Sequence, residues 1–567
     1  MRIHRAPLVS AVSLLLLGLL VFGRSLTFDF VPYDDPAYVT ENRFVNEGLS
    51  LEGLRWAFLY GSQLGDLSHQ GVENLWHPLT WVSHMLDVEV FGMESAWGHH
   101  AVNLLFYLLT SLLVMWVAGM VLKNHWAGFF VALLWMVHPL KAESVAWVTE
   151  RKDVLSGFFF WATLGCMVRG FEKGSRWRWI GYGCFVAALL SKPSVVVLPA
   201  LILLVEGFVK GEEKWGVSFI FGSLKRWWLW WVTAAMAALV SIMMQAGGSH
   251  DYFIGQSSFV DRMMTAGLGF WLYCYRILVP WNLAFEYPPP EAGWVVLAMA
   301  WVGLLVAGAV VWWKRRAWRL VFLGAAWFVV CWLPASGVLY VGSSFTADRY
   351  VYLALAGPLF VFCDWLMRSR WRVAVGGLVA LLWSGLAWKQ VGVWENGWTL
   401  FQHATKAQPR MTAGWVNLGG MYQNEQNWED AARCYEQAIA LNKKNYGAWF
   451  NLGNVYKAKK QQVDAAAAYA SSLEAYPHYL PAILNLGLLK RESGDLKGAQ
   501  ELFRRGRDRD LRMLWLSCEC ALALRDFDEA QQLLERLEQE KVSHAQILDG
   551  MKRARAFLDA QGSSGKE

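Results

Sequence analysis

Charged side chains are scarce in this sequence. Lys, Arg, Asp and Glu make up 17% of the 567 residues, whereas soluble domains average about 25%. Hydrophobic residues reach 55% and gather in runs of about 16–22 residues until roughly residue 390, after which the chain becomes charged and Ala-rich. The scarcity of charge excludes a wholly soluble protein. Its uneven distribution predicts a polytopic membrane region followed by a soluble tail.

Two kinds of binding motif are also lacking. The eight cysteines show no Cys-x-x-Cys spacing, so we expect free thiols and no metal site. No Gly-rich phosphate loop is visible, which disfavours a soluble nucleotide as a substrate. We therefore expect no metal, no cofactor and no nucleic-acid partner.

Apolar segments predict about eleven membrane spans. One further segment, 262–280, contains Gly267, Gly269, Arg276 and Pro280, and it fits a half-buried or re-entrant helix as well as a span. The predicted spans are about 8–22, 102–121, 126–137, 154–168, 178–190, 194–209, 227–245, 292–313, 320–335, 350–367 and 373–390.

Basic residues predict the orientation of these spans. They fall in loops on one side of the membrane only if 262–280 does not cross, which favours eleven spans over twelve. The first span is expected to stay uncleaved, because no small-residue cleavage site follows it. The N-terminus is then cytoplasmic, and the tail lies on the opposite side. The basic loops contain Arg2, Arg5, Lys123, Arg169, Lys173, Arg176, Arg178, Lys210, Lys214, Lys225, Arg226, Lys314, Arg315, Arg316, Arg319, Arg368, Arg370 and Arg372.

The tail repeats itself every 34 residues, as the separation of Trp415 and Trp449 shows. Each of these Trp residues opens the pattern Trp-x-x-Leu-Gly-x-x-Tyr, and a third copy is centred on Gly487. This period is typical of the tetratricopeptide repeat, a pair of antiparallel helices that buries its apolar face against neighbouring repeats. We predict an α-solenoid of about four repeats, the last degenerate, over 396–567, after a membrane domain over 1–395. The array either binds a peptide or is purely structural.

Acidic, basic and imidazole side chains gather in the loops predicted to be non-cytoplasmic. Asp34 and Asp35 follow the first span and stand between Pro32 and Pro36, which stiffen the turn. Ionised groups beside hydrocarbon are costly, so the acid pair is expected to have a function. The other members are Glu73, His77, His84, Asp87, His99, His100, Asn103, His138, Glu143, Glu150, Arg151, Lys152, Asp153, Lys192, Asp348, Arg349 and Tyr350.

Plainer interpretations exist for several of these residues. His84 and His100 fit interfacial positions, and Asp87 fits a helix-turn partner of a neighbour. The run from Glu150 to Asp153 fits a solvated loop with internal ion pairs, and Lys192 fits a side chain that snorkels from a span end. The functional interpretation depends on the convergence of several loops at one membrane face.

Transfer from a lipid phosphate needs this mixture of groups. A carboxylate accepts the proton of an acceptor hydroxyl, and Arg or Lys neutralises the charge that develops on a phosphate leaving group. The adjacent Asp34 and Asp35 should differ in pKa, because like charges this close raise one of the two values. Which of them is the base stays open.

Four motifs resemble a known family, the transmembrane and tetratricopeptide-repeat O-mannosyltransferases. The longest is the run from His138 to Asp153, HPLKAESVAWVTERKD. The others are Tyr33-Asp34-Asp35, Trp76-His77-Pro78-Leu79-Thr80 and Ser191-Lys192-Pro193. The likeness covers nearly the whole chain, including its domain order.

This resemblance implies an all-α membrane bundle of the GT-C glycosyltransferase type and a polyprenyl-phosphate sugar as donor. It places the catalytic acid at Asp34 or Asp35, whereas Arg151, Lys152, Lys192 and Arg349 are candidates to bind the donor phosphate. Supporting roles are expected for His77, His84, His100, His138, Glu143, Glu150, Asp153, Asp348 and Tyr350. The short loops suggest a bacterial inner-membrane protein with a periplasmic tail.

We interpret the sequence as an inverting, metal-independent transferase that moves a hexose, mannose among the options, to Ser or Thr hydroxyls of a protein or peptide. Two alternatives stay open. One is a non-catalytic membrane scaffold, in which Asp34 and Asp35 would be dispensable. The other is a transferase acting on lipid or cell-wall glycan, which would keep its activity without the residues after 396.

Overall fold

The structure, a computed structural model, describes residues 5–60, 76–93, 96–211, 217–245, 258–289, 291–338, 345–540, 542 and 544–564. Glu73 lies outside the described residues. Every regular element in the described ranges is a helix, which confirms the all-α prediction. The chain divides into two compact units, Met1–Gln408 and Pro409–Glu567, here called the membrane unit and the repeat unit. The boundary proposed from sequence at 395 stays a prediction.

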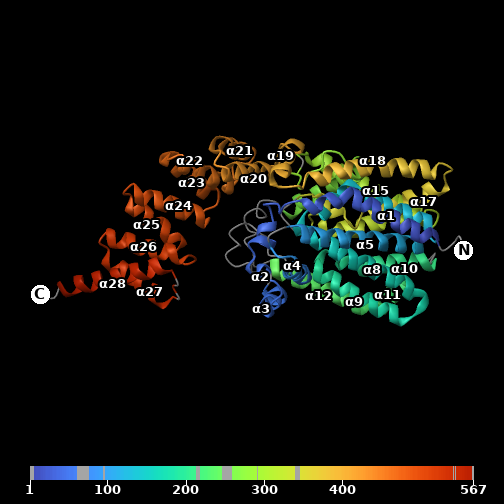
Figure 1. The fold of residues 1–567 in the computed structure, drawn as a ribbon, viewed down its shortest axis with the longest axis horizontal. Helices are drawn as coiled ribbons and strands as arrows, with labels where there is room; N and C mark the ends of the chain where they lie inside the picture. Colours follow the sequence, from blue (N-terminus) through green and yellow to red (C-terminus); the bar gives the residue numbers. More distant parts are fainter. Residues whose placement is uncertain are drawn as a thin grey trace. The chain divides into compact units, whose positions relative to one another are not determined.

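The membrane unit is a bundle of long helices with short helical turns at one end (Figure 1). Its α-helices are α1 (Arg5–Phe22), α2 (Arg43–Asn46), α3 (Leu51–Arg55), α4 (Pro78–Phe91), α5 (Trp97–Val121), α6 (His125–Met136), α7 (Ala142–Ala146), α8 (Arg151–Lys173), α9 (Ser175–Ser191), α10 (Leu198–Lys210), α11 (Val217–Arg226), α12 (Trp228–Gln245), α14 (Phe259–Leu278), α15 (Trp294–Trp313), α16 (Arg319–Trp332), α17 (Ala356–Arg368), α18 (Arg372–Gly392) and α19 (Gly397–Ala407). The turns are η1 (Gly23–Thr27), η2 (Pro36–Thr40), η3 (Trp56–Tyr60), η5 (Pro139–Lys141), η6 (Val148–Glu150), η7 (Pro193–Val197), η8 (Leu333–Ala335) and η9 (Asp348–Val351).

Six described helical segments are long and apolar enough to cross a membrane, and the number rises to eight if each of two bent pairs forms one span. All eleven predicted spans coincide with helices, but α9 and α17 do not meet these criteria and α16 is a shorter apolar helix. The protein is therefore a multi-pass membrane protein. The count of eleven spans stays a prediction.

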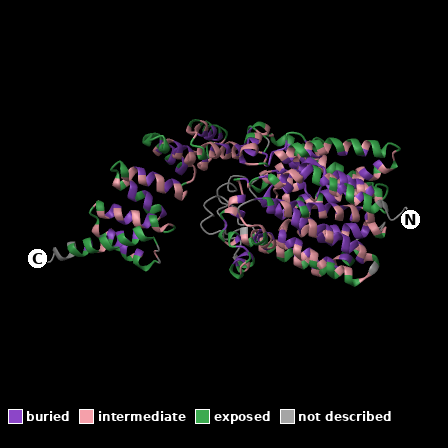
Figure 2. Ribbon diagram, viewed as in Figure 1, coloured by how far each residue is buried: buried purple, intermediate pink, exposed green. Residues whose placement is uncertain are grey.

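Helices α1, α5 and α8 run side by side in the bundle, and Figure 2 shows their inner faces buried. Helix α6 lies unusually close to α5. A Cβ atom built on Gly128 would stand only 2.6 Å from the backbone nitrogen of Gly119. Small residues allow such close approach between membrane helices, whose association depends on van der Waals packing. A larger side chain at Gly128 would push α6 away from α5.

The chain turns sharply after α6. Pro139 has no amide hydrogen and ends the helix, and the Nδ1 atom of His138 accepts a hydrogen bond from the Leu140 amide at 3.2 Å. The segments on either side of this break differ in direction by 64°. Every residue from Val131 to Gly157 is buried. The alternative interpretation of Glu150–Asp153 as a solvated loop is therefore wrong, because the motif folds back into the bundle as η5, α7, η6 and the start of α8.

The repeat unit consists of helix pairs packed in series. Its helices are α20 (Thr412–Asn424), α21 (Trp428–Leu441), α22 (Tyr446–Ala458), α23 (Gln462–Ala475), α24 (Leu480–Glu492), α25 (Leu496–Gly506), α26 (Leu511–Ala523), α27 (Phe527–Gln539) and α28 (Ala545–Ser564). The repeated glycines receive an aromatic ring from the second helix of each pair: Gly419 meets Tyr435, Gly453 meets Tyr469, and Gly487 meets Phe503. The predicted helix pairs are confirmed.

These glycines give a test of the packing. Replacing Gly453 by Ala would place a Cβ atom 2.6 Å from the Tyr469 ring, and the Tyr469 hydroxyl is held by Asn454 at 2.8 Å. We expect the substitution to lower the free energy of unfolding by about 1–3 kcal/mol. Gly447, in the same helix, meets no atom closer than 3.5 Å, so Gly447→Ala should be neutral or stabilising. Urea unfolding of a 409–567 fragment measures both changes, and equal effects would contradict this account.

Candidate functional site

Asp35 ties the first loop to the buried motif. Its carboxylate accepts hydrogen bonds from the Val31 amide at 2.8 Å, the Thr149 amide at 3.0 Å and the Thr149 hydroxyl at 2.5 Å. Burial raises the pKa of Asp35 to about 6, against the lowering effect of these hydrogen bonds. Near neutral pH the group is therefore ionised and able to accept all three. Three of its roughly four acceptor positions are thus occupied, which suits Asp35 to position the loop.

Asp34, by contrast, is only half-buried. It interacts electrostatically with Lys152, which lies at the start of α8. The preceding Tyr33 ring packs against Trp147 and Phe285, with ring centroids 5.5 and 5.0 Å apart. The structure therefore separates two acids that are adjacent in sequence: one faces an aromatic and cationic surface, and the other is enclosed.

Three cations converge on Glu150, whose side chain is 1% exposed. The Lys152 Nζ atom lies 3.1 Å from one carboxylate oxygen, the Arg349 Nε atom lies 3.4 Å from the same oxygen, and the Lys192 Nζ atom lies 3.6 Å from the other. These cations come from α8, from the end of α9 and from η9, and they retain 7%, 17% and 14% side-chain exposure. We call Glu150, Lys152, Lys192 and Arg349 the cation cluster.

The neighbouring carboxylates hold the cation cluster in place. Glu143 accepts hydrogen bonds from the Arg349 guanidinium at 2.5 Å and from the Arg349 amide at 3.0 Å. Asp153 pairs with Lys192 and also accepts from the Ser144 hydroxyl at 2.9 Å. Buried charges need partners of this kind, since desolvation otherwise costs several kcal/mol per ion.

His77 lies beside the same cations. Its side chain is buried, and burial together with the charges of Lys152 and Lys192 holds its pKa well below the usual range. Neither ring nitrogen has a hydrogen-bond partner among the described residues. A neutral imidazole with both nitrogens unpaired is suited to contact a polar ligand bound at the cation cluster.

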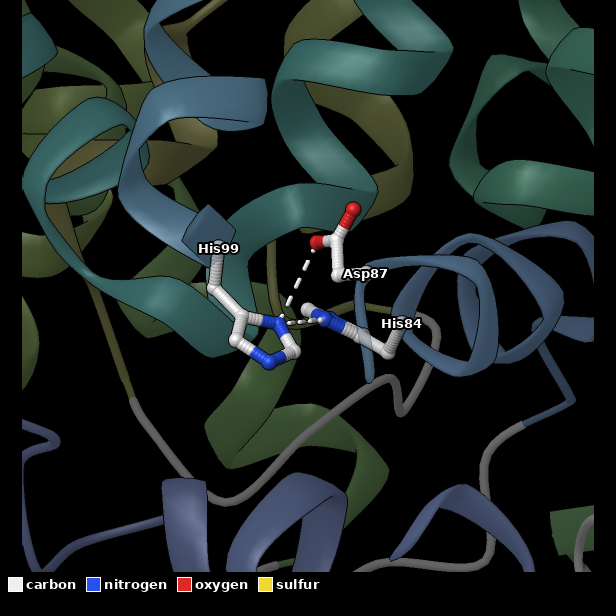
Figure 3. Close-up of side chains that lie close together, drawn as sticks. All are labelled: His84, Asp87 and His99. Atoms are coloured by element: carbon white, nitrogen blue, oxygen red, sulfur yellow. Dashed lines mark hydrogen bonds and ion pairs between the residues drawn. The ribbon is translucent and has the colours of Figure 1, made fainter. Parts of the chain in front are cut away.

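Arg151, the neighbour of Lys152, points into a separate buried network. Its guanidinium donates to Asp87 at 2.6 Å, to the His99 carbonyl at 2.7 Å and to Asn103. Its side chain is completely buried and pairs with Asp87 rather than Glu150. The structure therefore places Arg151 outside the cation cluster, and its role in phosphate binding stays a prediction. His84 completes the network beside Asp87 and His99 (Figure 3).

The remaining residues selected from sequence have the following contacts in the described ranges, and their roles stay predictions. His138 contacts the Ile277 carbonyl at 3.1 Å, and His100 is buried with its ring edge-on to Phe28. Asp348 accepts from the Tyr287 hydroxyl at 2.9 Å, and burial raises its pKa to about 7. Tyr350 lies under the Arg349 guanidinium, 5.1 Å from ring centroid to Cζ.

Thr149 and Tyr33 were not selected from sequence as site residues, although both stand in the quoted motifs. Thr149 supplies two of the three donors to Asp35, and Tyr33 joins the aromatic surface beside Asp34. A hydroxyl next to an acidic run carries little signal without the fold, because its partner is 114 residues away.

Comparisons with known proteins identify one family profile and several related proteins. The profile of the tetratricopeptide repeat family matches residues 422–479. Protein O-mannosyl-transferase TMTC1 from Homo sapiens is 24% identical over 473 residues, which cover 71% of this chain and 52% of that protein. TMTC4 from Mus musculus is 25% identical over 400 residues, covering 60% and 53%. The chain is a homologue of the TMTC protein O-mannosyltransferases.

The predicted resemblance is thereby confirmed, although each match covers only part of this chain and of the relative. The chain spans about half the length of these two TMTC relatives. A shorter match to TMTC1 from Mus musculus reaches 34% identity over 161 residues, or 27% of this chain and 16% of that protein. Among solved structures, the TPR protein YrrB aligns with 28% of this chain and 84% of its own at 18% identity, with a TM-score of 0.26.

The contrast between the two acids predicts different effects on stability. In Asp35→Asn an amide NH2 must face either Val31 or Thr149, so a buried donor loses its acceptor. We expect a loss of about 1–3 kcal/mol, seen as a lower melting temperature of the purified protein in detergent. Asp34→Asn, the matched control, changes a half-buried side chain and should shift the melting temperature much less. Equal shifts would show that Asp35 does not hold the loop.

Proposed function

We propose that the membrane unit transfers a hexose from a polyprenyl-phosphate donor to Ser or Thr hydroxyls of a protein on the non-cytoplasmic face. The observation that carries this proposal is the cation cluster beside the half-buried Asp34. Homology to proteins named O-mannosyltransferases supports the reaction class and favours mannose as the hexose. The GT-C type of bundle, a bacterial inner membrane and a periplasmic repeat unit belong to the same proposal.

The donor phosphate fits the cation cluster by charge. Lys152, Lys192 and Arg349 are tethered by carboxylates yet keep some exposure, so they can exchange part of their contact with Glu150 for phosphate oxygens. Charge-assisted hydrogen bonds to phosphate are among the strongest polar contacts in proteins. Because these cations are already positioned, they can stabilise the charge that develops on the leaving phosphate without reorganising.

Asp34 is the base in this proposal. The acceptor hydroxyl oxygen forms a bond to the anomeric carbon, the bond from that carbon to the phosphate oxygen breaks, and the hydroxyl proton passes to the Asp34 carboxylate. The electron pair of the broken bond stays on the polyprenyl phosphate beside the cations. Attack from the face opposite the phosphate inverts the anomeric centre, and none of these steps uses a metal ion.

The repeat unit is the proposed binding element for the acceptor protein or for a partner. Tetratricopeptide arrays present extended surfaces suited to peptides. A transferase that acts on lipid or cell-wall glycan is the alternative. Removing the residues after Gln408 separates the two, because glycan transfer would survive the truncation whereas transfer to protein would fall.

Neutralising Lys192 tests the donor site. Lys192→Gln removes one cation from the cation cluster and should weaken donor binding by about 10–100-fold, the scale of one charge-assisted contact. The measurement is the KM for a synthetic polyprenyl-phosphate hexose. Lys389→Gln serves as the control, because Lys389 is an exposed lysine that lies over Trp281 and outside the cation cluster. An unchanged KM in Lys192→Gln would remove Lys192 from the donor site.

Neutralising Asp34 tests the chemical step. Asp34→Asn keeps the side-chain shape but cannot accept the proton, so turnover should fall by roughly 100-fold or more while donor binding stays nearly unchanged. Single-turnover transfer to a Ser-containing peptide measures the chemical step directly. Full activity in the variant would end the assignment of Asp34 as the base, whereas a lack of transfer by the wild-type protein would favour the scaffold alternative.

A further inference from the structure

We propose that His84, Asp87 and His99 bind one divalent transition-metal ion, for which zinc is the best chemical fit, and that this ion fixes α4 to the start of α5. The three side chains offer one ligand atom each, and these atoms lie within 4.8 Å of one another. All three are buried. This inference is independent of the transferase proposal, since the ion takes no part in sugar transfer.

Two of the three separations between the ligand atoms match a coordination site. The Nδ1 atoms of His84 and His99 are 3.1 Å apart, and the His99 Nδ1 atom is 3.2 Å from the Asp87 Oδ2 atom (Figure 3). With zinc–nitrogen and zinc–oxygen bonds of about 2.0–2.2 Å, ligand atoms in a tetrahedral site stand about 3.3 Å apart. These two separations are thus already close to the spacing that a single ion requires, and all three ligand atoms lie within 4.8 Å of one another.

Hydrogen bonds alone do not satisfy this arrangement. If the Nδ1 atom of His99 carries a proton, that one proton must serve both the Asp87 carboxylate and the His84 Nδ1 atom. If that nitrogen instead carries a lone pair, it accepts from His84 but faces the lone pairs of the Asp87 carboxylate. A neutral imidazole has one donor and one acceptor nitrogen, so one contact is always poorly paired. A cation at the centre accepts lone pairs from all three atoms.

The chemistry of the three side chains suits a transition-metal ion. Two imidazoles and one carboxylate form a set of borderline ligands that suits zinc and its neighbours better than magnesium or calcium.

Arg151 limits the strength of the site. Its guanidinium contacts the same oxygen of Asp87 at 2.6 Å and also donates to Asn103 and the His99 carbonyl. With an ion bound, the carboxylate would lie between two positive charges, and the three side chains leave one tetrahedral position without a protein ligand. We expect the ion to bind more weakly than at a structural site with four protein ligands, but tightly enough to fix α4 against α5. Arg151, which contacts this site, directly precedes Lys152 of the cation cluster.

Metal analysis of the untagged full-length protein in detergent tests the proposal. After stripping with a chelator, zinc addition and dialysis, mass spectrometry of the elements should find about one zinc per chain. Cobalt in place of zinc should give the visible absorption bands of a tetrahedral nitrogen and oxygen site. A cobalt–thiolate charge-transfer band would place the ion on a cysteine and would overturn the assignment, as would zinc content near zero.

Three substitutions locate the ion: His84→Gln, Asp87→Asn and His99→Gln. Each should reduce zinc from about one per chain to near zero, because a two-ligand site does not retain the ion through dialysis. His100→Gln is the matched control, since His100 is the next residue on α5 and equally buried but is not a ligand. Zinc should also raise the melting temperature of wild type and His100→Gln but not of Asp87→Asn. Wild-type zinc content in the three ligand variants would overturn the proposal. If a variant misfolds, the cobalt spectrum of the wild-type protein still tests which side chains bind the ion.

Discussion

Glu150 is buried, and three cations from three separate segments surround it. This charge balance is the constraint on which the site depends. Removing one partner from such a group leaves an uncompensated buried charge, at a cost of about 3–5 kcal/mol. The bundle must therefore bring α8, the end of α9 and η9 together for the motif to stay inside. The same ion pairs hold Lys152, Lys192 and Arg349 in the positions where the proposed donor phosphate would bind.

The buried motif also divides neighbouring residues between different tasks. Asp35 accepts three hydrogen bonds and fixes the loop, while Asp34 interacts electrostatically with Lys152. In the same way Arg151 is enclosed by Asp87 and Asn103, while Lys152 reaches Glu150. A helix rotates by about 100° per residue, so adjacent positions on α8 face different surroundings. In each pair, one residue (Asp35 or Arg151) is held in a buried hydrogen-bond network, and the other (Asp34 or Lys152) belongs to the proposed site.

Much of the fold could be predicted from sequence, because apolar runs and the 34-residue period are local signals. The assignments within the site were harder. No local pattern distinguishes Asp34 from Asp35, since the partner that occupies Asp35 is Thr149, 114 residues away. Likewise, His84 and Asp87 share a helical face, but His99 joins them only through the packing of α4 on α5. The burial of Glu150–Asp153 was hard to predict because a run of charges also fits a solvated loop, whereas in the fold these charges pair with Asp87, Lys192 and Arg349 from other segments.

Intact-mass analysis of exported proteins tests the central claim most directly. Cells that carry the protein, cells that lack it and cells that carry Asp34→Asn are compared. The account predicts that one or more exported proteins gain mass in whole hexose units only when wild-type protein is present, and that the added mass maps to Ser or Thr. Identical mass spectra from wild-type and Asp34→Asn cells, both with hexose attached, would contradict the role of Asp34. Identical spectra from all three, with no hexose in any, would contradict the transferase itself.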